Sequence, residues 1–292
     1  MAIGVIGESL VDVFADATGV TAEQPGGSPF NIAVGLARLD IATELFTVIG
    51  DDRRGELLLS VLSAEGIVVH RGAATSPTAV AAAAVNAAGR ASYSFDLVWD
   101  PRFGASRPEL EALHFGSLGS VVAPGAAEVA AIVDGYRGKA LISYDPNWRD
   151  GVTHIDAREV VEANAARADL VKLSTDDAAA VYPGADLETV AHTLLNLGPA
   201  LVIITKGADG ASAWTHATEK HCPAAAADVV DTVGAGDAFM ATVLSELGGM
   251  TRDKVAALNR RELELVLEFG AFVAGRTCER AGADPPRLAD LF

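Results

Sequence analysis

The chain has 292 residues, of which 50% are hydrophobic and 21% are charged, a composition typical of a globular protein and not of a disordered one. Its 22 Lys and Arg residues are outnumbered by 39 Asp and Glu residues, which gives a net charge of −17 and argues against a nucleic-acid partner, because binding to a phosphate backbone relies on clustered cations. This length fits one large α/β domain or two small ones.

Cysteine spacing and apolar runs argue against a disulfide-rich, secreted or membrane protein. Cys222 and Cys278 match no metal or redox spacing. The chain begins with the strand-like AIGVIG, without a basic segment or a cleavage site. The most Ala/Val-rich run, residues 79–85, is far shorter than a membrane span. We therefore expect a cytoplasmic protein with no membrane partner.

The N-terminal segment predicts a strand over residues 2–6, a turn at 7–9 and a second strand over 10–14. Alternation in the second strand places Asp12 opposite its apolar neighbours. This pattern fits an ordinary exposed strand residue as well as one that faces a ligand.

A glycine-rich turn and a helix start follow in the string GGSPFN. Ser28 is a good N-cap and Pro29 a good first helical residue, so a helix is expected from here through Leu39. Gly26 and Gly27 would let a ligand approach the backbone closely. Asn31 can offer a donor and an acceptor to a polyol, although a capped helix alone explains the same residues.

Two segments with a period of two, residues 79–85 and 91–97, predict a strand pair inserted into the α/β chain. Together with the strand that carries Asp12, they predict a small β lid built from roughly residues 9–25 and 74–98. Such lids often exclude water from a reaction. Phe95 lies on the apolar face of the pair, and this face also suits a homodimer formed through the lid.

From residue 113 onward, expected strands and helices alternate, which is typical of a mostly parallel sheet with helices on both faces. The expected strands cover residues 113–117, 140–144, 170–173 and 201–205, and the expected helices 126–136, 157–167, 187–197 and 262–277. Ligands of such sheets bind beyond the carboxyl ends of the strands. The polar residues at those ends are Asp145, Asn147, Arg149, Lys172, Ser174, Asp177, Thr205, Lys206 and Gly207.

The most informative stretch, residues 228–247, reads as a strand end, the turn Gly234-Ala235-Gly236, and Asp237 at the start of an apolar helix. Backbone N–H groups that converge at a glycine turn and a helix N-terminus can hold an anion. Beside a bound phosphate, Asp237 could accept a proton from an incoming hydroxyl. An ordinary tight turn explains the four residues GAGD equally well, whereas a dinucleotide-binding turn and a Walker A loop fail on spacing.

The string DTVGAGDAF closely resembles the C-terminal signature of the ribokinase-like sugar kinases, the family that includes fructokinase, ribokinase and adenosine kinase. GGSPFNIAVGLARL is similar to the N-terminal signature in the form typical of bacterial fructokinases. The resemblance covers residues 4 to about 282. It implies a three-layer ribokinase-like fold with a β lid, in one kinase domain over residues 1–292. It also implies that Asp237 is the catalytic base and that Gly234, Ala235 and Gly236 form the anion hole.

The same resemblance implies ligand contacts. Sugar contacts are expected from Asp12, Gly26, Gly27, Asn31, Phe95 and Arg149. Nucleotide contacts are expected from Asn147, Lys172, Ser174, Thr205, Gly207, Gly210, Gly234 and Gly236. Mg²⁺ is expected to accompany ATP, with Asp177 acting through water, and Asp231 is expected to hold a monovalent cation such as K⁺. Ser174 and Asp177 stand where many relatives have Asn and Glu, and Ala271 stands where many have Asn.

The expected reaction is ATP-dependent phosphorylation of a primary hydroxyl of a small sugar, D-fructose above all. Kinases of 2-keto-3-deoxygluconate or of a pentose are the alternatives among enzymes of the family, and a sugar-binding relative that has lost catalysis is the alternative outside the enzyme class. A sugar acid would need a cation aimed at it from the lid, and residues 92–97 contain none. Arg102 is the nearest substitute for such a cation, and Asp96 and Asp100 would partly offset its charge.

Overall fold

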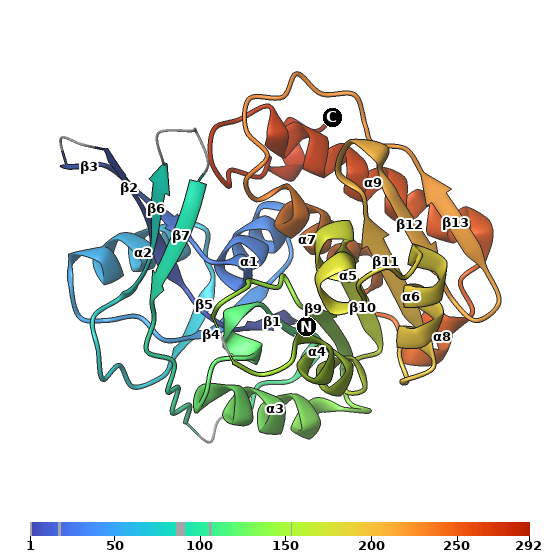
Figure 1. Ribbon diagram of the computed structural model, residues 1–292, viewed down its shortest axis with the longest axis horizontal. Coiled ribbons are helices and arrows are strands. Elements are labelled where there is room, and N and C mark those ends of the chain that lie inside the picture. Colours follow the sequence, from blue (N-terminus) through green and yellow to red (C-terminus); the bar gives the residue numbers. More distant parts are fainter. Residues whose placement is uncertain (1, 17–18, 86–90, 105–106, 153) are drawn as a thin grey trace.

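The computed structural model describes residues 2–16, 19–85, 91–104, 107–152 and 154–292. Within them, two sheets form: a large one with the strand order β13-β12-β11-β10-β9-β8-β1-β4-β5 and a small one with the order β3-β2-β6-β7 (Figure 1). The large sheet is parallel from β5 to β11, and β12 and β13 add to its edge in antiparallel pairing. This is the predicted α/β architecture.

The strands of the large sheet are short and mostly apolar, as expected for parallel strands that are covered on both faces. They are β1 (Ala2–Ile6), β4 (Thr43–Thr47), β5 (Val68–Arg71), β8 (Leu110–Gly116), β9 (Leu141–Asp145), β10 (Leu170–Ser174), β11 (Leu201–Thr205), β12 (Ala211–Trp214) and β13 (Glu219–Cys222).

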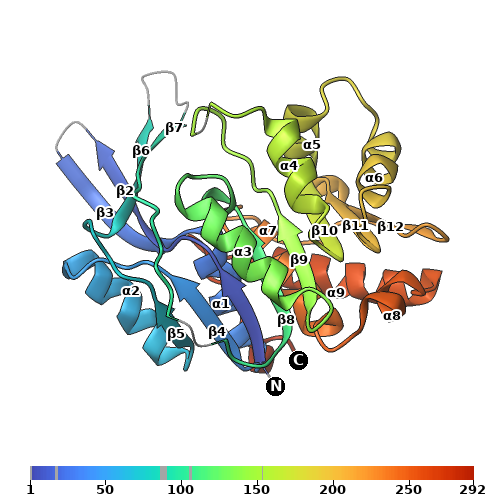
Figure 2. The ribbon, with the colours of Figure 1, turned by 90° about the horizontal axis from the view of Figure 1, so that it is seen from below.

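Helices cover the two faces of this sheet and give the fold three layers (Figure 2). One core contains buried side chains of α1 (Ser28–Arg38), α2 (Arg53–Ala64), α7 (Ala235–Leu247), α8 (Arg252–Ala256) and α9 (Arg260–Cys278). The other contains buried side chains of α3 (Gly125–Tyr136), α4 (Ala157–Ala165), α5 (Thr175–Val181) and α6 (Leu187–Leu195).

The small sheet is formed by the segments predicted as a β lid, and we refer to it as the lid. It consists of β2 (Leu10–Asp16), β3 (Gly19–Gly26), β6 (Ala79–Val85) and β7 (Ala91–Asp96). β2 and β6 pair in parallel, while β3 and β7 pair with them in antiparallel fashion. Because β2 follows β1 after only three residues, the lid lies directly beside the carboxyl end of β1.

Two local predictions were wrong. Ser28 does not cap α1: the N-cap is Gly27, with φ of 100°, and no side chain bonds to the free amides of the first turn. Residues 228–233 do not end a strand either. Val229 and Val230 in this segment are exposed, so they do not have the burial that a strand of the central sheet requires.

α1 and α7 pack against each other unusually closely. A Cβ atom added to Gly35 of α1 would lie 2.8 Å from the Cβ of Ala241 in α7, well inside the normal contact distance. α7 itself is buried along most of its length, since it lies between α1 and α9. The distance between α1 and α7 is therefore set by the missing side chain of Gly35.

We predict that Gly35→Ala separates the first turns of α1 and α7 and lowers kcat of the reaction expected from the resemblance by about 10²-fold, because misplacement by about 1 Å can cost that much. The measurement is steady-state kinetics together with thermal unfolding. The matched control is Gly135→Ala in α3, where the added methyl group has open space. An unchanged kcat in Gly35→Ala would contradict this account of the helix contact.

Candidate active site

Two cavities meet at the N-terminus of α7. The first, the lid cavity, has a volume of about 500 Å³ and lies between the lid and the large sheet. The second, the alanine cavity, has a volume of about 560 Å³ and is lined largely by alanine and glycine, including residues 224–227. Thr232 and Gly236 line both cavities. A group that passes from one cavity to the other must therefore pass the start of α7.

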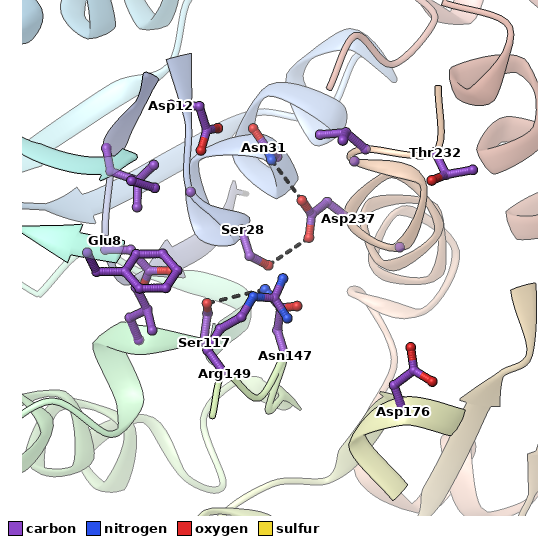
Figure 3. Close-up of a pocket in the computed structure, with 18 of the residues that line it drawn as sticks. Glu8, Asp12, Ser28, Asn31, Ser117, Asn147, Arg149, Asp176, Thr232 and Asp237 are labelled. Carbon is purple, nitrogen blue, oxygen red and sulfur yellow. Dashed lines mark hydrogen bonds between the residues drawn. The ribbon is translucent and has the colours of Figure 1, made fainter. Parts of the chain in front are cut away.

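Asp237 lies at this junction, in the first turn of α7 (Figure 3). Two side chains of α1 hold its carboxylate: Ser28 Oγ donates to Oδ1 at 2.7 Å, and Asn31 Nδ2 donates to Oδ2 at 2.8 Å. Burial raises the pKa of Asp237, while the bonds from Asn31 and Ser28 oppose this shift. The carboxylate is thus fixed in orientation and is a stronger base than a free aspartate.

The turn before Asp237 has the backbone conformation that its glycines predict. Gly234 is the N-cap of α7 and has φ of 77°, and a Cβ there would lie 2.6 Å from that of Ala283. A Cβ at Gly236 would lie 3.2 Å from Lys172 Nζ. The free amides of the helix start and the Lys172 ammonium group therefore converge on one point, which favours an anion.

Lys172 is buried and forms an ion pair with Asp145, with 2.8 Å between Nζ and Oδ2. Burial raises the pKa of Asp145 to about 6, against the opposing effect of Lys172. Asp145 also accepts the backbone amide of Asn147 at 3.2 Å. Removing either partner of such a pair would leave an unpaired buried charge.

Asp12 faces the lid cavity from β2. Burial raises its pKa to about 6, the nearby charge of Asp237 adds to the shift, and Arg149 opposes it. A Cβ at Gly26 would lie 2.1 Å from Asp12 Oδ2, and one at Gly27 would lie 2.8 Å from the carbonyl oxygen of Glu8. Both glycines are thus required for the backbone to pass this close to the cavity wall.

The remaining residues expected to contact the sugar also lie in the lid cavity, which Asn31, Phe95 and Arg149 line. Asn147, expected to contact the nucleotide, lines this cavity as well. Thr205, Gly207 and Gly210 instead line the alanine cavity, and so does Ala271. The structure thus divides the expected ligand contacts between the two cavities.

Ser174 and Asp177 form the capping box of α5. Asp177 is buried: its Oδ1 accepts the amide of Trp148 at 2.7 Å, and its Oδ2 accepts the amide and the hydroxyl of Ser174 at 2.8 and 2.7 Å. The neighbouring Asp176 is exposed and lines the lid cavity (Figure 3). The carboxylate that reaches the cavity is therefore one residue before the expected one.

Asp231 accepts the backbone amides of Gly282 at 2.9 Å and Val233 at 3.1 Å. These bonds lower the pKa of its carboxyl group, so Asp231 is ionised at neutral pH. Within the described part of the chain, no group of three or more His, Cys, Asp or Glu side chains is arranged to hold a metal ion.

Two residues of the lid cavity, Glu8 and Ser117, were missed from the sequence. Both follow the last residues of parallel strands, β1 and β8, so the rule that ligands bind beyond strand ends could have found them. Glu8 is 1% exposed, and burial raises the pKa of its carboxyl group from 4.5 to about 7.

We predict that ionisation of Glu8 destabilises the protein. A carboxyl group whose pKa is higher in the folded state keeps its proton there longer, so stability falls as pH rises from about 4.5 to above 7. The free energy of unfolding of the wild type, relative to Glu8→Gln, should fall over this range by up to about 3 kcal/mol. Urea unfolding at several pH values measures it, with the exposed Glu56→Gln as the control. A pH-independent difference would contradict the assignment.

Comparisons with known proteins agree with this geometry. Residues 3–289 match the model of the pfkB family of carbohydrate kinases. The chain is 35% identical to a fructokinase of Rhizobium leguminosarum bv. trifolii, over 88% of this chain and 84% of that one. It is 30% identical to a fructokinase of Klebsiella pneumoniae, over 88% of each chain.

Solved structures agree on the fold. A fructokinase of Xylella fastidiosa with bound ATP superimposes with a TM-score of 0.88 at 23% identity, over 99% of this chain and 96% of that one. A sugar kinase of Pyrococcus horikoshii in complex with ATP gives a TM-score of 0.76 at 27% identity, over 99% and 96%.

No helix among the described residues is both long and apolar enough to cross a membrane. The family match extends over nearly the whole chain and includes both signatures and both cavities. The chain therefore belongs to the pfkB family of carbohydrate kinases, enzymes that transfer a phosphoryl group to a sugar hydroxyl.

Proposed function

We propose that this protein is a fructokinase, which transfers the γ-phosphoryl group of ATP to a primary hydroxyl of D-fructose. The observation that carries the proposal is the position of Asp237, held by Ser28 and Asn31 where the two cavities meet. The identity to named fructokinases supports the choice of fructose. The basic test is whether ATP is consumed only when sugar is present.

The sugar occupies the lid cavity with its reacting hydroxyl next to Asp237. Asp237 accepts the hydroxyl proton as the oxygen attacks the γ-phosphorus. Ser28 and Asn31 each keep one carboxylate oxygen occupied by a donor, so the base is aimed before the sugar arrives. Asn31 also retains its side-chain oxygen as an acceptor for the sugar.

Charge on the transferred phosphoryl group is stabilised at the start of α7. The backbone amides of Gly234, Ala235 and Gly236 supply donors, and Lys172 supplies a positive charge beside Gly236. Because Lys172 is held by Asp145, its ammonium group is in place in the free enzyme. Such preorganised charge needs no rearrangement during the reaction.

Asp12 binds sugar hydroxyls through its carboxylate, and Gly26 and Gly27 let the sugar approach the backbone. Phe95 supplies the apolar face that a sugar ring packs against. Arg149 lines the same cavity and can reach the sugar or the transferred phosphoryl group.

The adenosine part of ATP occupies the alanine cavity, next to Thr205, Gly207 and Gly210. The small side chains there leave space for a flat ring, and Phe239 and Cys278 add apolar surface. Ala271 contributes no hydrogen bond, so we propose that adenine is recognised mainly by shape and apolar contact.

Mg²⁺ enters with ATP and supplies charge neutralisation at the phosphates. Asp176 is a carboxylate that lines the lid cavity, whereas the described residues contain no group of three or more His, Cys, Asp or Glu side chains that could hold a metal ion. The ion would therefore be held mainly by the phosphates of ATP. Asp177, engaged by Trp148 and Ser174, acts only indirectly in this proposal. A monovalent cation such as K⁺ at Asp231 remains a prediction.

Three broader expectations also remain predictions: one kinase domain over residues 1–292, a homodimer through the lid, and a cytoplasmic location, where ATP is available as the phosphoryl donor. Size-exclusion chromatography with light scattering measures the second. A monomer at micromolar concentration would contradict pairing through the lid.

We predict that Asp237→Asn lowers kcat by about 10²–10⁴-fold, because a carboxamide keeps the shape but cannot accept the proton. ATP affinity, measured by calorimetry, should change little. Asp253→Asn, at an exposed site outside both cavities, is the matched control and should leave kcat unchanged. A kcat above one tenth of the wild-type value in Asp237→Asn would rule out its role as base.

We further predict that kcat/KM for fructose exceeds that for 2-keto-3-deoxygluconate at least tenfold. A sugar acid must place its carboxylate in a cavity already lined by Asp12 and Asp237. Arg102, the expected substitute for a lid cation, is exposed and lies beside Asp100. A coupled ADP-release assay with both sugars measures the ratio, and a preference for the sugar acid would contradict this selectivity.

A further inference from the structure

Three polar side chains of the lid cavity have no part in the transfer step: Glu8, Ser117 and Asn147. In Figure 3, Glu8 lies to the left of Asp237, which is near the centre of the view, and Ser117 and Asn147 lie next to each other. These residues come from the ends of three neighbouring strands of the large sheet, β1, β8 and β9. We call them the strand-end cluster.

Two members of the cluster have unusual backbone conformations. Ser117 has φ of 50° and Asn147 has φ of 38°, values that residues other than glycine rarely adopt. Asn147 Nδ2 donates to Ser117 Oγ at 3.3 Å. Residues with such strained backbone conformations are concentrated at functional sites.

Glu8 is fixed by its surroundings. Its Oε2 accepts the backbone amide of Gly119 at 2.8 Å, and the carbonyl of Gly119 accepts Trp99 Nε1 at 2.9 Å. A Cβ at Gly119 would lie 2.8 Å from the Cα of Gly7, so the turn packs tightly on the β1–β2 connection. A buried carboxyl group that lowers stability when ionised, yet is held this rigidly against a cavity, indicates a binding role.

We propose that Glu8, Ser117 and Asn147 form a subsite that binds the hydroxyl groups of the sugar remote from the reacting one, and that this subsite selects neutral sugars over sugar acids. This inference rests on the proposed sugar kinase activity and assigns residues to substrate selection. Glu8 is a hydrogen-bond acceptor when ionised. The Ser117 hydroxyl interacts with Glu8 and can rotate from it to a sugar oxygen, and Asn147 offers its side-chain oxygen. Alternating donors and acceptors match neighbouring hydroxyl groups of a polyol.

The charges of the cavity favour the same conclusion. Glu8, Asp12 and Asp237 are three carboxyl groups that line one cavity of about 500 Å³. Two cations line the same cavity, Lys172 and Arg149, and Lys172 is paired with Asp145. A substrate carboxylate placed against Glu8 would meet a like charge at low dielectric.

The first test uses Glu8→Gln and Asn147→Gly. Glutamine retains an oxygen for the Gly119 amide, and glycine adopts the left-handed backbone of Asn147 without strain. We expect KM for fructose to rise 10- to 100-fold in each variant, because each variant loses a hydrogen bond to a charged or buried group. KM for ATP should stay within threefold of the wild-type value. Glu56→Gln, at an exposed site of α2, is the matched control.

The second test separates binding from a structural role. Fructose analogues that each lack one hydroxyl, with the reacting hydroxyl kept, are assayed with wild type and both variants. At least one analogue should lose tenfold or more in kcat/KM with wild type and much less with a variant, since the partner is already gone. Equal losses in all three enzymes would overturn the proposal. If Glu8→Gln fails to fold, Asn147→Gly decides in the same assay.

Selectivity gives a third readout. The ratio of kcat/KM for 2-keto-3-deoxygluconate to that for fructose should rise at least tenfold in Glu8→Gln. A wild-type enzyme that phosphorylates no neutral sugar would contradict the proposed function. A wild type active on fructose, with KM for fructose within threefold in both variants, would contradict only the subsite.

Discussion

The contact between α1 and α7 is the constraint on which the site depends. It brings Ser28 and Asn31 to Asp237, over separations of 209 and 206 residues in the chain. The helices can approach this closely because Gly35 faces Ala241 without a side chain. This single helix contact thus orients the proposed base, closes one end of the lid cavity and positions the anion-binding turn. The fold and the chemistry share the same few contacts.

Buried negative charge is the second organising feature. The pKa values of Asp12, Asp145 and Glu8 are all raised by burial, and that of Asp237 is raised as well. Such a site is costly to hold in the absence of cations. Among the described residues that line the cavity, Lys172 is paired with Asp145, and Arg149 opposes the rise in the pKa of Asp12 and of Asp237. These two cations therefore offset part of the negative charge.

The sequence allowed the fold and the start of α7 to be predicted because both depend on local signals: apolar strands, helix periods, and glycines before an acidic first helical turn. Predictions from the sequence were wrong where a local pattern competed with a contact between residues far apart in the chain. Ser28 has the sequence pattern of an N-cap, yet its hydroxyl bonds to Asp237, which no local rule contains. The spacing of the family resemblance indicated Asp177, but the side chain of Asp177 is engaged in the capping box of α5. Glu8 and Ser117 have no local pattern, because their role arises only where strand ends meet.

The lid cavity has walls of two origins, and this bears on how substrate choice is divided. The small sheet supplies Asp12 and Phe95. The large sheet supplies Glu8, Ser117 and Asn147 from strand ends that are fixed by the parallel pairing of β1, β8 and β9. Groups on a rigid sheet discriminate between sugars by geometry, because they cannot adjust to a misplaced hydroxyl. Groups on a lid contribute most after closure, when water is excluded and their interactions strengthen. In the proposed subsite, the large sheet therefore selects the sugar by geometry, and closure of the predicted lid would exclude water around it.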